Sequence, residues 1–331
     1  MRVIAAVDKF RGTATAHEVA SAIGDACWDL GHEVVEIPLA DGGEGLLDVF
    51  GGPNRHNTVT GPLGTPVEAG WRSNGKTAII EMAQAAGLQL AGGAEGNRPL
   101  DATTAGVGEL ILAAVSGGAK RVIVGLGGSA TTDGGLGALQ AIGSKGRIAG
   151  VTLDIACDVS TRFTDAPRVF GPQKGASATE IKFLEGRLER LAQQYLDDYG
   201  IDVREISGSG AAGGLAGGLV ALGGTIQTGF DLVADEVGLY DAIESADLVI
   251  TGEGFMDEQS FQGKVVGGVA GLAQRHNVPV VIICGDAESG MSTDIPVHTL
   301  VSRWGEQRAF SATRQCIAGT AREILQSFEK R

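Results

Sequence analysis

Short runs of apolar residues recur along the chain, and most of them lack strict alternation with polar residues. Uninterrupted runs rich in Val and Ile are typical of strands that are buried on both faces of a parallel sheet. We expect strands in eight segments: 2–7, 33–39, 77–82, 121–126, 152–157, 247–252, 279–284 and 297–302.

Helices are predicted between these runs by their capping residues. Thr15 and Glu18 have the spacing of a capping box, apolar residues follow at helical intervals, and Gly31 provides a stop. Ser177 and Glu180 repeat the spacing ahead of a second helix. Strands that alternate with helices indicate an α/β fold with parallel-rich sheets.

The two ends of the chain differ from its middle. The ends hold compact βα units, whereas the middle is richer in Gly and Thr and less regular. The length of 331 residues is sufficient for two domains. We therefore expect two α/β domains: a Rossmann-like domain with a parallel-rich sheet, formed by residues 1–57 plus 246–331, and a Gly-rich domain, residues 58–245, inserted into it.

Charge and cysteine content narrow the function classes. The net charge is −14, which disfavours binding to nucleic acid or to an anionic membrane surface. An anionic ligand would need its own local cluster of cations. The four cysteines are widely spaced, as in a reduced, cytosolic protein, and the short apolar start predicts neither a signal peptide nor a membrane span.

Glycine makes up 53 of the 331 residues, against a usual share of about 7%. One dense cluster, GLGGSATTDGG at 125–135, lies between a predicted strand and a predicted helix. Free backbone amides at a helix start attract anions, and Ser and Thr add hydroxyl donors. The cluster is therefore a candidate phosphate loop, with Gly127, Gly128, Ser129 and Thr131 as donors; the alternative is a tight turn.

Three further segments place charged residues directly after predicted strands, where α/β sheets bind ligands. DKFRGT offers Asp8, Lys9 and Arg11, and the two cations are suited to an anionic substrate. ADGGEG places Asp41 beside glycines, where a carboxylate can bind Mg²⁺ or hydroxyl groups. The plain alternatives are a solvated turn for the first segment and a helix N-cap for the second.

The third segment, TGEGFMDEQSFQGK at 251–264, combines Glu253, Asp257 and Lys264. Phosphoryl transfer requires an acid that orients or deprotonates a hydroxyl and a cation that neutralises the transferred group. Asp257 and Lys264 are therefore the catalytic candidates, with a surface ion pair as the alternative. Two more candidate segments are FGPQKGAS with Lys174 and SGSGAAGG with Gly213 and Gly214, the second a further anion cradle.

Taken in order, these segments resemble the bacterial glycerate kinase family over nearly the whole chain. The stretches that carry the resemblance are VDKFRGTATAHEVA, PLADGGEG, IEMAQAAGL, TTAGVGELI, GLGGSATTDGG, ACDV, FGPQKGAS, GAAGGLAGGL and LVITGEGFMDEQSFQGKV.

The resemblance implies transfer of the γ-phosphoryl group of ATP to D-glycerate with Mg²⁺, giving 2-phosphoglycerate, in a cleft between two α/β domains. Lys9 and Arg11 would then bind the acceptor carboxylate, with Asp8, Asp41 and Lys174 as further substrate-binding residues. Asp133 and Glu253 are the metal candidates. The oligomeric state, including a homodimer, stays open.

Three features depart from the family pattern. The stretch GSKGRIAGVTLD, ahead of ACDV, is shorter than usual; Phe255 stands where the family has a basic residue; and Arg11 replaces a common Lys. These departures leave room for another small hydroxy acid, such as a four-carbon sugar acid, as substrate. A catalytically silent ligand sensor is the alternative from a different class.

Overall fold

The computed structural model describes residues 1–261 and 264–328. Their contacts divide the chain into two compact units. Unit 1 consists of Met1–Asp41 and Phe230–Arg331, and unit 2 of Gly42–Gly229. Both divisions come earlier in the chain than the boundaries expected from the sequence. At the first, α2 (Leu46–Val49) is held within unit 2, because the Glu81 carboxylate accepts hydrogen bonds from the amides of Gly45 and Leu47.

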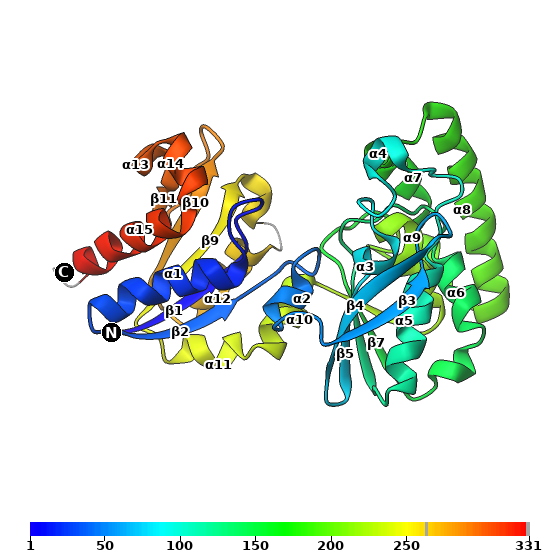
Figure 1. Cartoon of the computed structure of the whole chain (residues 1–331), viewed down its shortest axis with the longest axis horizontal. Coiled ribbons are helices and arrows are strands. Elements are labelled where there is room, and N and C mark those ends of the chain that lie inside the picture. Colours follow the sequence, from blue (N-terminus) through cyan, green and yellow to red (C-terminus); the bar gives the residue numbers. More distant parts are fainter. Residues whose placement is uncertain (262–263, 329–331) are drawn as a thin grey trace. The chain divides into compact units, whose positions relative to one another are not determined.

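Unit 1 contains a five-stranded parallel sheet in the order β2-β1-β9-β10-β11 (Figure 1). When its strands are counted in chain order within this unit, the sheet has the doubly wound order 2-1-3-4-5. The strand order reverses between β1 and β9. The elements are β1 (Arg2–Val7), α1 (Ala16–Asp29), β2 (Glu33–Pro38), α10 (Gly229–Glu236), α11 (Leu239–Glu244), β9 (Leu248–Met256), η5 (Glu258–Phe261), α12 (Val265–Arg275), β10 (Val280–Ala287), β11 (Val297–Thr299), α13 (Leu300–Trp304), α14 (Glu306–Ser311) and α15 (Thr313–Phe328).

Both faces of this sheet are buried, as the unbroken apolar runs predict. Alternate residues such as Val3 and Ala5 of β1 pack with α1 and α15, which lie side by side in Figure 1. On the opposite face, Ile282 of β10 packs with Val266 of α12. Helix α1 begins at the predicted capping box, in which Thr15 and Glu18 bond each other's backbone.

Unit 2 contains a six-stranded sheet in the order β3 to β8, antiparallel from β3 to β5 and parallel from β5 to β8. The elements are β3 (Arg55–Thr60), β4 (Pro66–Asn74), β5 (Thr77–Glu81), α3 (Ala83–Ala86), α4 (Gly93–Gly96), α5 (Ala105–Ser116), β6 (Arg121–Gly125), α6 (Leu136–Ile142), η1 (Lys145–Ile148), β7 (Thr152–Ala156), η2 (Phe163–Asp165), α7 (Ala166–Phe170), η3 (Pro172–Lys174), α8 (Ala178–Tyr199), η4 (Val203–Glu205), α9 (Ala211–Ala221) and β8 (Thr225–Gln227).

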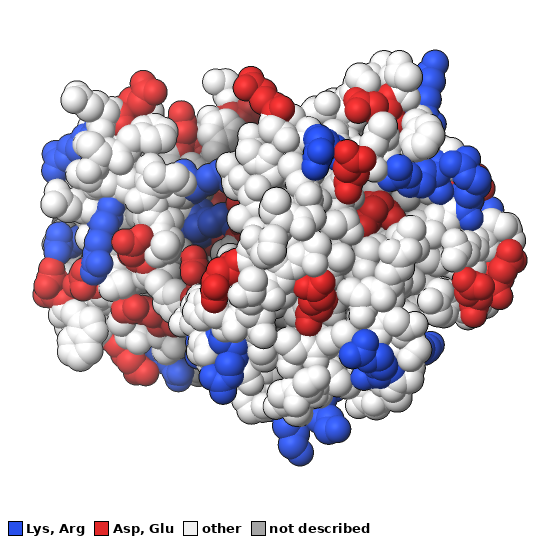
Figure 2. Space-filling view, turned by 45° about the vertical axis from the view of Figure 1, so that its right-hand side comes forward, with Lys and Arg blue, Asp and Glu red and all other residues white. Residues whose placement is uncertain are grey.

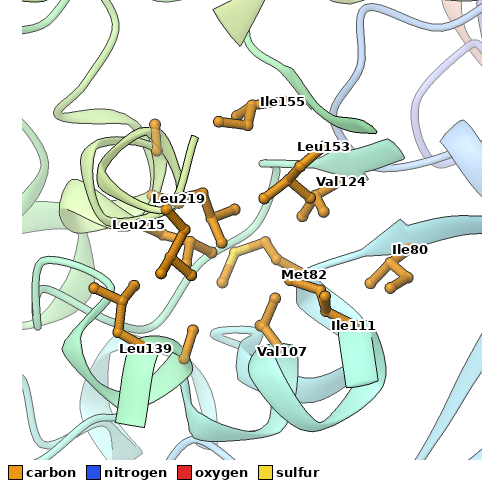
Figure 3. Close-up of a cluster of buried hydrophobic side chains, with 14 of the residues drawn as sticks. Ile80, Met82, Val107, Ile111, Val124, Leu139, Leu153, Ile155, Leu215 and Leu219 are labelled. Atoms are coloured by element: carbon orange, nitrogen blue, oxygen red, sulfur yellow. The ribbon is translucent and has the colours of Figure 1, made fainter. Parts of the chain in front are cut away.

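One hydrophobic core joins this sheet to its helices. Val124 of β6 and Leu153 of β7 meet Val107 of α5 and Leu215 of α9 there (Figure 3). The parallel strands β5 to β8 all end at the same edge of the sheet. Because ligands bind beyond the carboxyl ends of parallel strands, the loops at this edge are the candidates for binding.

The fold prediction of two α/β domains is confirmed, with corrections in detail. The expected strand at 297–302 stops at Thr299, because the Thr299 side chain accepts a hydrogen bond from the Ser302 amide and caps α13. Strands β3, β4 and β8 were not predicted. None of the described helices is long and apolar enough to cross a membrane.

Candidate active site

In unit 1, the sheet places predicted site residues at the carboxyl ends of β1 and β9, where the strand order reverses. Asp8 and Lys9 directly follow β1, and Glu253 lies near the end of β9. The backbone of Phe10 and Arg11 passes over β9, since a Cβ on Gly254 would lie 3.0 Å from the Arg11 amide nitrogen. A side chain at position 254 would therefore be tightly packed against this backbone.

Asp8 is a half-buried carboxylate beside other acids. Burial and the charges of Asp41 and Glu253 together raise its pKa to about 7, against the opposing charge of Lys9. The Lys9 amide donates to Asp8 Oδ1 at 2.6 Å, which also favours the ionised form. Asp8, Lys9, Asp41 and Glu253, predicted separately along the sequence, therefore interact electrostatically.

Glu253 connects this group to the catalytic candidates. Burial raises the pKa of its carboxyl group, the nearby Ser260 hydroxyl and the charge of Lys264 lower it, and Asp257 and Asp41 raise it. Its Oε1 atom is buried and has no hydrogen-bond partner among the described residues. An orphaned buried carboxylate oxygen is an atom that a cation or a ligand hydroxyl can satisfy.

Asp257 is held in place by a local turn. Its Oδ1 accepts hydrogen bonds from the amide of Ser260 at 3.0 Å and from the hydroxyl at 3.3 Å, while its own amide donates to Ser260 Oγ. The second carboxylate oxygen receives no hydrogen bond from the described residues. Lys264 is half-buried at the start of α12. Residues 262 and 263 of this predicted segment lie outside the described residues.

In unit 2, two glycine-rich segments that are far apart in the sequence come together. A Cβ on Gly127 would lie 2.5 Å from the Glu44 amide nitrogen, and one on Gly128 would lie 2.4 Å from Glu44 Oε1. Glycine is therefore required at 127, because the Gly43–Glu44 backbone lies against the loop that follows β6, and it is favoured at 128 by a φ of +65°. The backbone amides of Gly127, Gly128 and Ser129 donate no hydrogen bond to any of the described residues.

Beyond Ser129 the same loop is buried. Thr131 is inaccessible to solvent, and its hydroxyl donates to the carbonyl of Ala212. Gly213 contacts it from α9: a Cβ there would lie 1.9 Å from the Thr131 carbonyl oxygen. Ala212, Gly213 and Gly214 all have positive φ, and for Ala212 this conformation is strained. Gly213 and Gly214 thus let two loops touch.

Asp133, a metal candidate from the sequence, has structural partners. Its carboxylate is 8% exposed and accepts hydrogen bonds from Thr104 N and Oγ1 at 2.8 Å, Gly135 N at 3.0 Å and Gly137 N at 3.1 Å. Four donors leave it little capacity for a metal ion. The metal assignment stays a prediction, and the contacts favour a role in holding the loop at the start of α6.

Lys174, predicted to bind substrate, is 2% exposed. Its Nζ donates to the Thr131 carbonyl at 2.7 Å. Asn97 donates to the carbonyls of Lys174 and Ala130 at 2.9 and 3.0 Å, and so joins the two segments. Asn97 and Thr104 were not predicted from the sequence, because their hydrogen-bond partners are distant in sequence and no local pattern indicates them.

Comparisons with known proteins identify the family of this chain. The sequence profile of the "Glycerate kinase family" matches residues 3–146 and 144–330. The chain belongs to the glycerate kinase family. The two matches meet in the short stretch ahead of β7, where the sequence departs from the usual family pattern.

Individual relatives cover most of the chain. "Glycerate 2-kinase" of Escherichia coli K12 is 39% identical over 325 residues, covering 86% of this chain and 85% of the relative. "Glycerate kinase" of Bacillus subtilis 168 has the same identity and coverage. A crystal structure from Salmonella typhimurium LT2, provisionally named glycerate kinase 2, has a TM-score of 0.85 and 33% identity, covering 100% of this chain and 98% of that one.

Membership of a kinase family implies ATP as the phosphate donor and a small molecule as the acceptor. On the surface, acidic and basic side chains are interspersed, and the basic ones lie in separate groups on the face in Figure 2.

Proposed function

We propose that the protein is an ATP- and Mg²⁺-dependent kinase that phosphorylates D-glycerate to 2-phosphoglycerate. Family membership supports glycerate as the acceptor. The observation that carries the proposal for this chain is the group at the carboxyl ends of β1 and β9, where Asp8, Lys9 and Glu253 interact and Asp257 and Lys264 influence Glu253. An acid and cations at this place in a doubly wound sheet meet the needs of phosphoryl transfer.

Lys9 and Arg11 bind the carboxylate of the acceptor in this proposal. Arg11 is exposed and its guanidinium can hold a carboxylate through two parallel hydrogen bonds. Asp41 accepts a hydrogen bond from an acceptor hydroxyl group. Binding both ends of a small hydroxy acid fixes the orientation of the hydroxyl that reacts.

Asp257 serves as the general base. Ser260 holds one of its carboxylate oxygens, which leaves the other to take the proton from the acceptor hydroxyl as that oxygen attacks the γ-phosphorus. The bond between the γ-phosphorus and the bridging oxygen breaks, and ADP leaves. Lys264 neutralises the negative charge on the transferred phosphoryl group.

The unpartnered amides of Gly127, Gly128 and Ser129 bind nucleotide phosphate, with the Ser129 hydroxyl as a further donor. Their positions beyond the carboxyl end of β6, before a helix, support this role. Thr131, Gly213 and Gly214 shape the loop from its buried side.

Mg²⁺ fits the acids of unit 1. The described residues contain no group of three or more His, Cys, Asp or Glu side chains that could hold a metal ion alone. Mg²⁺ with a nucleotide needs only one or two carboxylates, since phosphate oxygens and water complete its ligands. The orphaned Oε1 of Glu253 is the oxygen we assign to it, beside Asp8 and Asp41. When bound, the ion neutralises charge on the β- and γ-phosphates.

A substrate panel tests the proposal. The purified protein is mixed with Mg·ATP and D-glycerate, L-glycerate, tartronate, erythronate or threonate, and ADP release is followed in a coupled assay. We expect turnover with D-glycerate above all others. Preference for a four-carbon acid would instead point to Phe255, a side chain in β9 that is 55% exposed, as a determinant of a different specificity. No turnover with any acid would contradict the kinase proposal.

A further inference from the structure

Lys174 is the only Lys or Arg side chain that is buried in the part of the chain that the structure describes. It ends the short helix η3 and lies beneath the loop that follows β6. Along that loop, Gly128 is exposed and Ser129 half-buried, whereas the next residues are buried. The ammonium group therefore contacts the buried part of the loop at Thr131, two residues after Ser129, the last of the amides to which we assign nucleotide phosphate.

No carboxylate in the described residues forms an ion pair with Lys174 within 4.0 Å. Asp133 is the acid that acts on it electrostatically, and that carboxylate already accepts four hydrogen bonds. The ring centre of Phe170 is 5.9 Å from Nζ and offers only a weak cation–π contact. A buried ammonium without a close counter-charge is costly, and burial lowers the pKa of Lys174 to about 7.

Hydrogen-bond donors are also in excess here. An ammonium group has three donors, and the Thr131 carbonyl is the acceptor found for Lys174. Next to it, the hydroxyl of Thr132 is completely buried and has no hydrogen-bond partner among the described residues. Surplus donors and an uncompensated positive charge are both relieved by an anion, so this region has the character of an anion site.

Building on the proposed function, we propose that Lys174 is the positioning residue of the nucleotide-phosphate loop. Its buried ammonium group holds the Thr131 carbonyl and supplies the positive charge that phosphate on Gly127–Ser129 neutralises. In this role Lys174 acts through the loop and does not contact the acceptor. A purely structural tether would stabilise the fold equally with and without nucleotide, and this difference makes the two roles separable.

The test compares Mg·ADP binding by isothermal titration calorimetry in the wild type, Lys174→Met, Lys174→Arg and a control, Lys182→Met. Lys182 is an exposed lysine of the same unit, on α8. Loss of a hydrogen bond from a charged group corresponds to about 10- to 100-fold weaker binding, which we expect for Lys174→Met. Lys174→Arg retains most of the affinity, and the control matches the wild type. The unfolding temperature of nucleotide-free Lys174→Met changes little, because removal of a buried charge offsets the loss of the hydrogen bond to the Thr131 carbonyl.

Wild-type affinity of Lys174→Met for Mg·ADP overturns the inference. So does a lowered unfolding temperature combined with equally weak binding in Lys174→Met and Lys174→Arg, because that result indicates a tether. If the wild type itself neither binds Mg·ADP nor shows kinase turnover, the proposed function fails as well. A wild type that binds and turns over while Lys174→Met binds normally refutes only the role of Lys174.

A measurement on the wild type keeps the inference testable if the variants do not fold. Lys174 is charged below its pKa and neutral above it, so affinity for Mg·ADP should fall as pH rises from about 7 to 9. The titratable groups that face it are Asp133 and, through Asp133, Tyr195, whose pKa is raised by burial so that it stays protonated over this range. Affinity that is constant over this range contradicts the inference.

Discussion

Replacing Asp133 by Asn distinguishes a structural carboxylate from a metal ligand. In the better orientation of the amide, the Asn oxygen takes the place of Oδ2 and keeps its partners Thr104 N, Thr104 Oγ1 and Gly137 N. These three bonds lose their charged acceptor. The amide nitrogen then faces the Gly135 amide, which loses its acceptor altogether.

The expected cost follows from these four contacts. Each bond that changes from a charged to a neutral acceptor loses about 1 kcal/mol, and the stranded Gly135 amide adds about 1–3 kcal/mol. The total is about 4–6 kcal/mol of unfolding free energy, a large part of the ~5–15 kcal/mol typical of a domain. The bonds hold the first turn of α6, so the loss should be local to unit 2.

Urea unfolding and amide hydrogen exchange measure this effect in Mg²⁺-free buffer. We expect lower stability and faster exchange at Gly135 and Gly137 in Asp133→Asn. The control Asp101→Asn removes an exposed acid of the same unit and should change stability by less than about 1 kcal/mol. Wild-type stability of Asp133→Asn, together with loss of Mg²⁺-dependent nucleotide binding, would refute the structural role and support the metal assignment.

Three further predictions concern both units. Asp257→Asn should lower kcat about 10²- to 10⁴-fold in the ADP-release assay, because the general base is lost; near-normal kcat would remove the assignment. Gly213→Ala should destabilise the protein in thermal unfolding, since the added Cβ would meet the Thr131 carbonyl oxygen at 1.9 Å in a left-handed conformation; an unchanged unfolding temperature would show that the loops can separate without cost. Asp8 has a raised pKa of about 7 in the folded protein, so its contribution to stability is present below its unfolded pKa of 3.8 and is lost as pH rises to about 7. Asp8→Asn should therefore be more stable than the wild type at pH 8 in EDTA but not at pH 4. Equal dependence of stability on pH in the two proteins would contradict the raised pKa of Asp8.

Much of the fold was predictable from local patterns. Unbroken apolar runs identify strands such as β1 and β6, whose two faces are both buried. The capping boxes at Thr15 and Ser177 mark the starts of α1 and α8. Strand β3 was missed because only Val59 of its six residues is buried, so its sequence RHNTVT carries no hydrophobic period.

The site was predictable only as far as single segments reveal it. The acids and cations after β1 and β9 could be identified because they directly follow predicted strands, and in the structure they lie near one another. Burial of Lys174 could not be predicted, because it depends on Thr131 and Asn97, which are distant in sequence. Glu81 likewise binds the amides of Gly45 and Leu47 across a long sequence separation.

The most direct test of the central claim is a ³¹P NMR time course of the wild-type protein with Mg·ATP and D-glycerate. We expect that ATP is consumed with stoichiometric formation of ADP and a phosphomonoester, and that the phosphorus couples to the proton on carbon 2 of glycerate. ATP signals that stay unchanged with D-glycerate, under conditions where the protein is folded, would contradict the account.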